Sequence, residues 1–129
     1  MQPTTIKKIV IIGPESTGKS TLNKQLAAHY QTIACPEYAR QYLNENGTAY
    51  SFDDLLAIAK GQLALEEKLT EHVSNLKFQA SYNHQLTSNN FSFLFIDTDM
   101  YVMKVWCEYV FSKCHQFILD EIISRQYDL

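Results

Sequence analysis

Residues 13–21 have the types and spacing that chemistry on phosphate groups requires, in the order Gly-Pro-Glu-Ser-Thr-Gly-Lys-Ser-Thr. The segment fits the pattern Gly-x-x-x-x-Gly-Lys-Ser/Thr. Its glycines let the main chain approach a polyphosphate, and successive amide N–H groups form a nest for anions. The lysine is expected to contact the β- and γ-phosphates of ATP, and the serine after it to ligate Mg²⁺. The predicted ATP-binding residues are Gly13, Glu15, Ser16, Thr17, Gly18, Lys19, Ser20 and Thr21.

The segments on either side of this loop support a bound nucleotide. Residues 6–12 form an apolar run typical of a strand, and residues 22–30 have the pattern of a helix with Leu22, Leu26 and Tyr30 on one stripe. A helix that begins near Lys19 adds unpaired N–H groups and a positive dipole end to the phosphate site.

Acidic residues follow a second apolar run. Residues 91–96 predict a strand buried on both faces, which ends at Asp97. An acid at the carboxyl end of such a strand can hold Mg²⁺ together with Ser20. Asp99 lies two residues further on and could enter the same crevice as a catalytic or substrate-binding group. For both aspartates the alternative is that the side chain caps the helix that follows.

A third candidate acid, Glu37, opens a helix predicted for residues 37–46, directly after a short strand at residues 32–35. A carboxylate at this edge of an open sheet could accept a proton from a substrate hydroxyl, or it could complement the helix dipole. Arg40 lies one turn later and could pair with Glu37 or reach a phosphate. Tyr38 and Tyr42 are neighbours at i,i+4 spacing and could present aromatic faces to a substrate.

The remaining candidates lie on two further helices. Ser51 is expected to cap a long amphipathic helix that Gly61 interrupts, which suggests close approach of a ligand or of another helix. Gln62 and Glu66 share one face of this helix, where they could bind substrate or be solvated. Trp106 lies on the apolar stripe of a later helix (Val102, Val105, Trp106, Tyr109 and Val110) and could pack in the core or stack on a ligand.

Composition excludes several classes of function. The chain has 129 residues, a net charge of −3 and 46% hydrophobic residues, as in one globular domain without a basic field for nucleic acid. Its apolar runs are too short for a signal peptide or a membrane span, so we expect a cytoplasmic protein. Three cysteines without a C-x-x-C pair predict free thiols, and the four histidines have no metal-ligand spacing.

The alternation of strands and helices predicts an α/β fold with a parallel sheet covered on both faces. Only three strands are predicted along the 129 residues, and the sequence stops where another strand could begin. We therefore expect a single domain over residues 1–129 that is a fragment of a longer domain. Exposed sheet edges would then favour a homo-oligomer.

Four segments together resemble the ribosylnicotinamide kinase domain of NadR-type proteins, a P-loop kinase domain also classed with AAA-like ATPases. They are residues 13–21, Pro-Glu-Tyr-Ala-Arg at 36–40, Ile-Ala-Lys-Gly-Gln at 58–62 with Glu66, and Phe-Ile-Asp-Thr-Asp at 95–99 followed by Trp106. The resemblance covers residues 9–129. It implies a nucleoside-kinase-like three-layer sandwich in which the C-terminal strands and the lid of the family domain are missing.

The resemblance also implies a reaction. ATP and Mg²⁺ would phosphorylate the 5′-hydroxyl of nicotinamide riboside to give nicotinamide mononucleotide in NAD salvage. Two alternatives are a non-catalytic ATP-binding module that regulates a partner, and an ATPase or kinase with another small-molecule substrate. The implied catalytic residues are Lys19, Glu37, Arg40, Asp97 and Asp99, and the implied substrate-binding residues are Glu37, Tyr38, Arg40, Tyr42, Gln62, Asp99 and Trp106.

Overall fold

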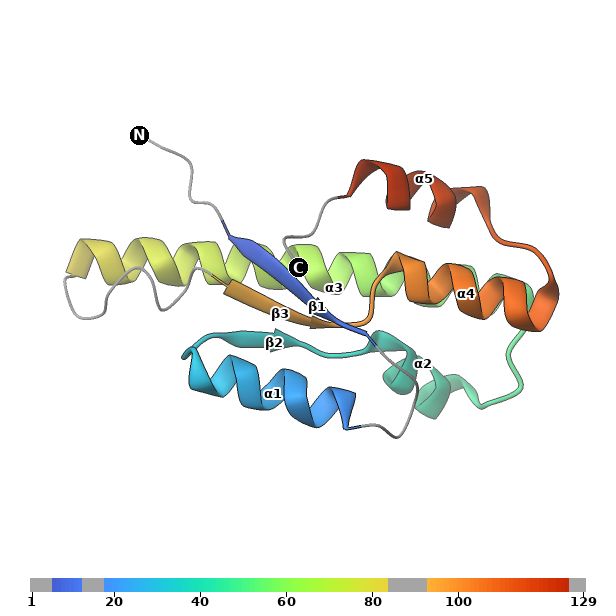
Figure 1. Cartoon of the computed structure of the whole chain (residues 1–129), viewed down its shortest axis with the longest axis horizontal. Coiled ribbons are helices and arrows are strands. Elements are labelled where there is room, and N and C mark those ends of the chain that lie inside the picture. The colour runs from blue at the N-terminus through green and yellow to red at the C-terminus, as the bar shows by residue number, and fades with distance from the viewer. Residues whose placement is uncertain (1–5, 13–17, 84–92, 126–129) are drawn as a thin grey trace.

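Three parallel strands form the centre of the molecule. The computed structural model describes residues 6–12, 18–83 and 93–125. In these ranges the strands β1 (Lys7–Ile11), β2 (Ile33–Cys35) and β3 (Phe93–Asp97) form one sheet in the order β1-β3-β2 (Figure 1). The central strand β3 is at most 2% exposed from Leu94 to Asp97. The prediction of a parallel sheet whose last strand is buried on both faces is therefore confirmed.

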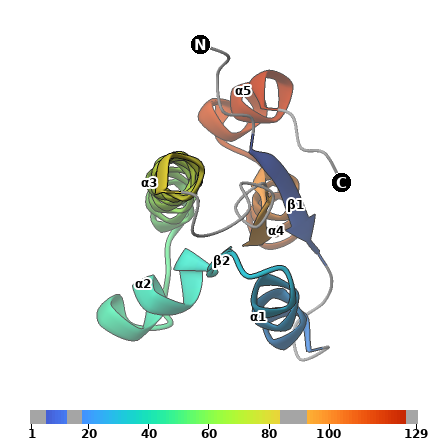
Figure 2. The same cartoon turned by 90° about the vertical axis from the view of Figure 1, so that its left-hand side faces the viewer.

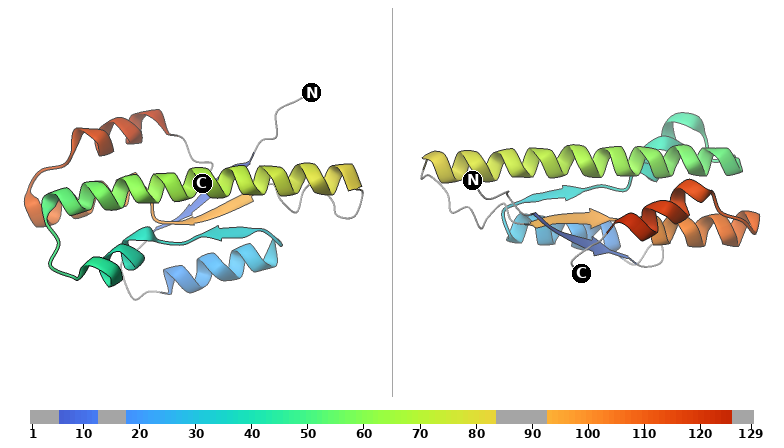
Figure 3. Two further views of the ribbon diagram at one scale, coloured as in Figure 1. Left: turned by 180° about the vertical axis from the view of Figure 1, so that it is seen from behind. Right: turned by 90° about the horizontal axis from the view of Figure 1, so that it is seen from above.

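Helices cover both faces of this sheet, so the fold has three layers. Figure 2 shows α1 on one side of the strands and α3 on the other. The helix α3 is a single long element that runs the length of the molecule beside the sheet (Figure 3). The described helices are α1 (Lys19–His29), α2 (Tyr38–Asn46), α3 (Phe52–Asn83), α4 (Met100–Phe111) and α5 (Gln116–Ser124).

Local side-chain chemistry sets where the helices begin and end. At the start of α3, the Ser51 hydroxyl accepts the backbone N–H of Asp54, whose carboxylate accepts the Ser51 N–H, 2.8 Å away. This reciprocal pair confirms Ser51 as the predicted cap. Gly47 ends α2 with a φ of 88°, a left-handed conformation that glycine adopts without a Cβ penalty.

The apolar side chains form two clusters, and both include residues of α3. The smaller one joins the sheet to α3 through Cys35, Val73, Leu94 and Ile96. The larger one lies where α3 meets the other helices, and it contains Ala39, Leu55, Ile58, Ala59, Leu63, Met100, Met103, Cys107 and Ile118. Because α2 contributes to this larger cluster, the turn between β2 and α2 is held against α3.

The helix α4 buries a different face from the predicted one. Met100, Met103 and Cys107 are its buried residues, whereas Val105 is 65% exposed and Tyr109 is 89% exposed. Nearly the whole circumference of α4 is apolar, so periodicity alone does not select the buried side. The predicted stripe on α1 also differs, since Asn23 and Ala27 face the sheet there.

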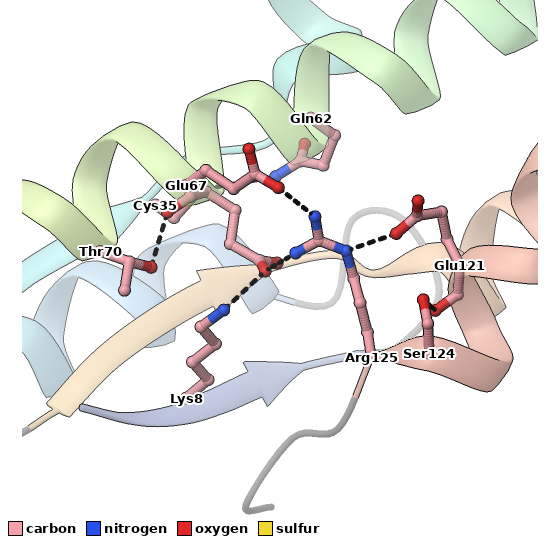
Figure 4. Close-up of polar contacts among 9 residues, drawn as sticks. Lys8, Cys35, Gln62, Glu67, Thr70, Glu121, Ser124 and Arg125 are labelled. Atoms are coloured by element: carbon pink, nitrogen blue, oxygen red, sulfur yellow. Dashed lines mark hydrogen bonds and ion pairs between the residues drawn. The ribbon is translucent and has the colours of Figure 1, made fainter. Parts of the chain in front are cut away.

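A charged network ties α3 to β1 and to the end of α5 (Figure 4). The buried Glu66 carboxylate lies 3.3 Å from the Lys8 ammonium and 2.8 Å from the Arg125 guanidinium. Arg125 also pairs with Glu67 of α3 and Glu121 of α5. Burial of a charge is tolerated only when it is paired, and Glu66 meets that condition with two cations.

Within the described residues, none of the helices combines the length and the apolar character needed to span a membrane.

Candidate functional site

The parallel arrangement brings the carboxyl ends of the strands to one edge of the sheet. The central strand β3 ends at Asp97, and Glu37 follows β2 after Pro36. The helix α1 starts at this same edge with Lys19 and Ser20. Ligands of open α/β sheets bind at such an edge, where neighbouring crossovers separate. Four of the predicted site residues therefore come together from three parts of the chain.

The centre of the site is the Lys19 side chain. Its ammonium lies 2.7 Å from Asp97 Oδ1 and donates a hydrogen bond to Glu37 Oε2 at 3.1 Å. The Ser20 hydroxyl donates to the other Asp97 oxygen at 2.5 Å. One cation thus faces two carboxylates, one of them almost fully buried. We call the residues Lys19, Ser20, Glu37 and Asp97 the acid–lysine cluster.

Electrostatics hold Lys19 in its charged form. Burial on its own lowers the pKa of this ammonium, but the hydrogen bonds to Asp97 and Glu37 outweigh burial and leave the pKa raised. Lys19 is therefore a cation at neutral pH, where a triphosphate is an anion. A permanent cation at the start of a helix is suited to binding an anion.

The described part of the phosphate loop has the conformation that an anion site needs. Gly18 has a φ of 83° and precedes α1, and a glycine has no side chain with which to cap the helix. Among the described residues no side chain caps the start of α1, and the first N–H groups of a helix are the donors that a phosphate binds. The predicted ligands Gly13, Glu15, Ser16 and Thr17 lie outside the described residues.

Three cavities in the described part of the chain border the acid–lysine cluster, and two of them also reach Arg40. One, of about 610 Å³, extends from the start of α1 past Glu37 and Arg40 to Tyr50 and Trp106. The other, of about 710 Å³, lies between α1 and α2 and also reaches Glu37, Arg40 and Asp97. Cavities of this size hold a nucleoside or a nucleotide. Arg40 is exposed and lines both cavities, so it is free to meet a ligand.

Three predicted substrate residues contact other parts of the protein, and of these Tyr38 also lines the cavity between α1 and α2. The Tyr42 hydroxyl donates to Asp54 at 2.6 Å, at the corner between α2 and α3. Gln62 is 1% exposed and hydrogen-bonds to the main chain around Glu37. The ring of Tyr38 lies over Gly61, where a Cβ would be 2.1 Å from it. The close approach predicted at Gly61 is thus made by another helix.

Asp99 adopts its capping alternative. Its carboxylate accepts the backbone N–H of Val102 at 3.1 Å at the start of α4, and Asp99 lines none of the three cavities that border the acid–lysine cluster. Burial raises the pKa of this carboxyl, against the opposing effect of the backbone bonds. Thr98, between the two aspartates, has a φ of 101° and is 3% exposed. Such a conformation in a β-branched residue is strained, and it separates the direction of Asp97 from that of Asp99.

Other lining residues were not predicted. Asn44 and Thr48 line the cavity that ends at Trp106, and the Trp106 indole donates to the Tyr50 hydroxyl at 2.9 Å. Asn44 lies one helical turn after Arg40, and this spacing was the available signal. Asn23 of α1 is buried, donates to the Cys35 carbonyl and lines the cavity between α1 and α2.

In the described residues there is no group of three or more His, Cys, Asp or Glu side chains suited to a metal ion. Magnesium does not need such a group, because it keeps several waters and takes phosphate oxygens with one or two protein ligands. The Ser20 hydroxyl and the Asp97 carboxylate, already in contact, are hard oxygen donors of the required kind.

The fold and this cluster define a class of protein. A parallel sheet with the phosphate-loop sequence between β1 and α1, and an acid at the end of the neighbouring strand, is the P-loop nucleotide-binding arrangement. Comparison with known proteins agrees, because a family described as an AAA domain matches residues 8–129. The chain belongs to this family.

The chain is also similar to characterised proteins. It is 28% identical to the trifunctional NAD biosynthesis/regulator protein NadR of Escherichia coli (strain K12), over all of this chain and 28% of that protein. The NadR protein of Salmonella typhimurium has the same identity and coverage. The chain thus spans little more than a quarter of the length of these relatives.

A solved structure has the same fold. The crystal structure of NadR protein in complex with NR superimposes with a TM-score of 0.73 at 22% identity, over 96% of this chain and 33% of that one. This likeness confirms the expected α/β fold, and the match extends over about a third of the solved chain.

Proposed function

We propose that this domain transfers the γ-phosphoryl group of ATP to the 5′-hydroxyl of nicotinamide riboside. The observation that carries the proposal is the acid–lysine cluster, in which Lys19 lies within 3.1 Å of a carboxylate from each of two strand ends. Phosphoryl transfer needs positioned charges more than covalent chemistry by the protein. The similarity to NadR proteins supports the choice of nucleoside.

Lys19 would neutralise part of the phosphate charge, and Asp97 would act through the Mg²⁺ ion that it holds. The ammonium of Lys19 would move from its carboxylate partners toward the β- and γ-phosphates, because a polyphosphate offers more negative charge than either partner. Ser20 and Asp97 would hold Mg²⁺, which supplies further neutralisation of the phosphates. Arg40 lines both cavities and would stabilise the charge on the transferring group.

Glu37 is the group we assign to the acceptor hydroxyl. Glu37 lines the cavities of 610 and 710 Å³, and its side chain is 24% exposed. When Lys19 turns to the phosphates, the Glu37 carboxylate is left next to the transferred group and able to accept a hydroxyl proton. Asp99 is the weaker candidate for this role, because its carboxylate already accepts the Val102 N–H.

The far end of the 610 Å³ cavity would hold the nicotinamide ring. The ring of nicotinamide riboside is a pyridinium cation, which favours aromatic faces. Tyr50 and Trp106 form an edge-to-face pair there, with ring centroids 5.2 Å apart. Their mutual hydrogen bond fixes both rings, so the wall is preorganised for a flat ligand.

The proposal is tested by ADP release from Mg²⁺-ATP with and without nicotinamide riboside. We expect riboside-dependent release that Lys19→Ala abolishes. Glu37→Gln should lower kcat without weakening ATP binding, since it removes a competitor for the Lys19 ammonium. ATP binding without any riboside-dependent release would refute the kinase and favour a regulatory ATP-binding module. Release that the riboside does not affect would indicate an ATPase or another acceptor.

A further inference from the structure

The side-chain amide of Gln62 holds the main chain on both sides of Glu37. Its Oε1 accepts the backbone N–H of Tyr38 at 2.8 Å, and its Nε2 donates to the carbonyl of Pro36 at 3.3 Å. Gln62 is 1% exposed and comes from the middle of α3, far along the chain from these partners. A single buried amide thus bridges the residue before Glu37 and the residue after it.

This bridge performs the task that an N-cap side chain normally performs. Glu37 is the N-cap of α2, yet its side chain makes no capping hydrogen bond. The first N–H groups of a helix need acceptors, and a glutamate in this position could otherwise turn back toward them. Gln62 supplies the acceptor from another helix. The Glu37 carboxylate is therefore left to extend toward Lys19, 3.1 Å from the ammonium.

Packing alone does not call for an amide at this position. Neighbouring buried positions of α3 carry Ile58, Ala59 and Leu63, so an apolar side chain would fill the space. Burying an amide costs free energy unless its donor and acceptor are both satisfied. Here the acceptor bonds to the Tyr38 N–H, and the donor bonds to the Pro36 carbonyl and, at 3.6 Å, to Cys35 Sγ. The absence of a side chain at Gly61 lets Tyr38 approach α3 closely enough for these bonds to form.

We propose that Gln62 is a positioning residue for Glu37, which sets the direction of that carboxylate for phosphoryl transfer. The inference rests on the proposed kinase function, in which Glu37 meets the acceptor hydroxyl. Displacement of a catalytic group by about 1 Å can reduce turnover on the order of a hundredfold. Loss of the bridge should therefore reduce kcat more than it reduces the binding of either substrate.

The test compares three variants of the full chain. Gln62→Met keeps length and removes both bonds, and Gln62→Glu keeps an acceptor for the Tyr38 N–H. Val73→Ala is the control, because Val73 is fully buried on the same helix but belongs to the cluster under the sheet. For each variant we would measure Tm, the KM of ATP and of nicotinamide riboside, kcat, and hydrogen exchange of the Tyr38 amide.

We expect Gln62→Met to lower kcat on the order of tenfold to a hundredfold, with both KM values within about twofold. Exchange of the Tyr38 amide should accelerate in the same variant. In Gln62→Glu that amide should stay protected, and kcat should fall less. Val73→Ala should lower Tm while kcat stays close to the wild-type value.

Two results would overturn the positioning role. One is an unchanged kcat in Gln62→Met, and the other is an equal loss of kcat in Val73→Ala at a similar Tm. If the wild-type chain phosphorylates no nucleoside, the kinase proposal fails by itself. Hydrogen exchange then tests whether Gln62 holds the Tyr38 N–H. An unchanged exchange rate of the Tyr38 amide in Gln62→Met would refute this contact, and a faster rate would support it.

Discussion

Replacing Gly61 by alanine should reveal how tightly α2 is seated on α3. A Cβ built at Gly61 lies 2.1 Å from Cε1 of Tyr38 and 2.5 Å from Cδ1. Carbon atoms in contact are about 3.5–4.0 Å apart, so the ring would have to move by about 1.5 Å. The ring belongs to the first residue of α2 and is partly buried against the larger cluster, which restricts its escape.

Two opposing effects set the size of the change. Alanine is favoured over glycine inside a helix by about 1 kcal/mol. Overpacking of a fitted contact costs about 1–3 kcal/mol. We therefore expect Gly61→Ala to destabilise the fold by about 1 kcal/mol, which corresponds to a fall in Tm of about 4 °C.

A double-mutant cycle separates the two effects. In a Tyr38→Ala background the obstacle is gone, and Gly61→Ala should then stabilise the fold by about 1 kcal/mol through helix propensity. The measurement is urea unfolding of the four proteins, followed by circular dichroism. The reasoning is refuted if Gly61→Ala has the same effect in both backgrounds, since the contact with Tyr38 would then play no part.

Three further predictions follow from buried groups. Glu66→Gln should lower the free energy of unfolding, measured with urea, by about 3 kcal/mol because it leaves two cations beside a neutral group. The control Glu67→Gln, at an exposed carboxylate, should change it by less than about 0.5 kcal/mol. Asp99→Asn should be neutral or stabilising at pH 7. Burial raises the pKa of the Asp99 carboxyl in the folded state. The stability linked to this carboxyl is therefore present below its unfolded pKa and is lost as the pH rises through the folded pKa. Asparagine should remove this pH dependence while its side-chain oxygen still accepts the Val102 N–H. A thiol reagent at pH 8 should label Cys114 alone in the native protein. Cys35 and Cys107 are buried, and burial raises the pKa of each thiol to about 12. Equal labelling of all three cysteines would contradict this burial.

The strands, and the acids at their ends, could be predicted from the sequence because their signals are local. A run such as residues 91–96 is apolar at consecutive positions, and an acid follows it directly. The cap at Ser51 was equally visible, since its partner Asp54 lies three residues further on. The acid–lysine cluster then followed from topology, because parallel strands end at one edge.

The roles of Gln62 and Glu66 could not be predicted, because their partners are distant in sequence. A polar residue on a helix face is usually solvated, and nothing nearby marks these two as buried. Gln62 bonds to backbone groups around Glu37, and Glu66 to cations of β1 and of the residue after α5. The buried face of α4 was also unpredictable, since apolar residues surround that helix.

The order of strands in the sheet has a consequence for synthesis of the chain. Within the described residues the first two strands pair with β3 and not with each other, with Lys7 opposite Phe93 and Ile33 opposite Leu94. Until β3 has been synthesised, β1 and β2 lack the strand with which each of them pairs, and α3 lacks β3 and the helices that follow it. Contacts this distant in sequence form slowly, so the nascent chain exposes its sheet-forming segments for longer than a hairpin-rich protein would. The step that brings Asp97 beside Lys19 is therefore also the step that joins β1 and β2 into one sheet.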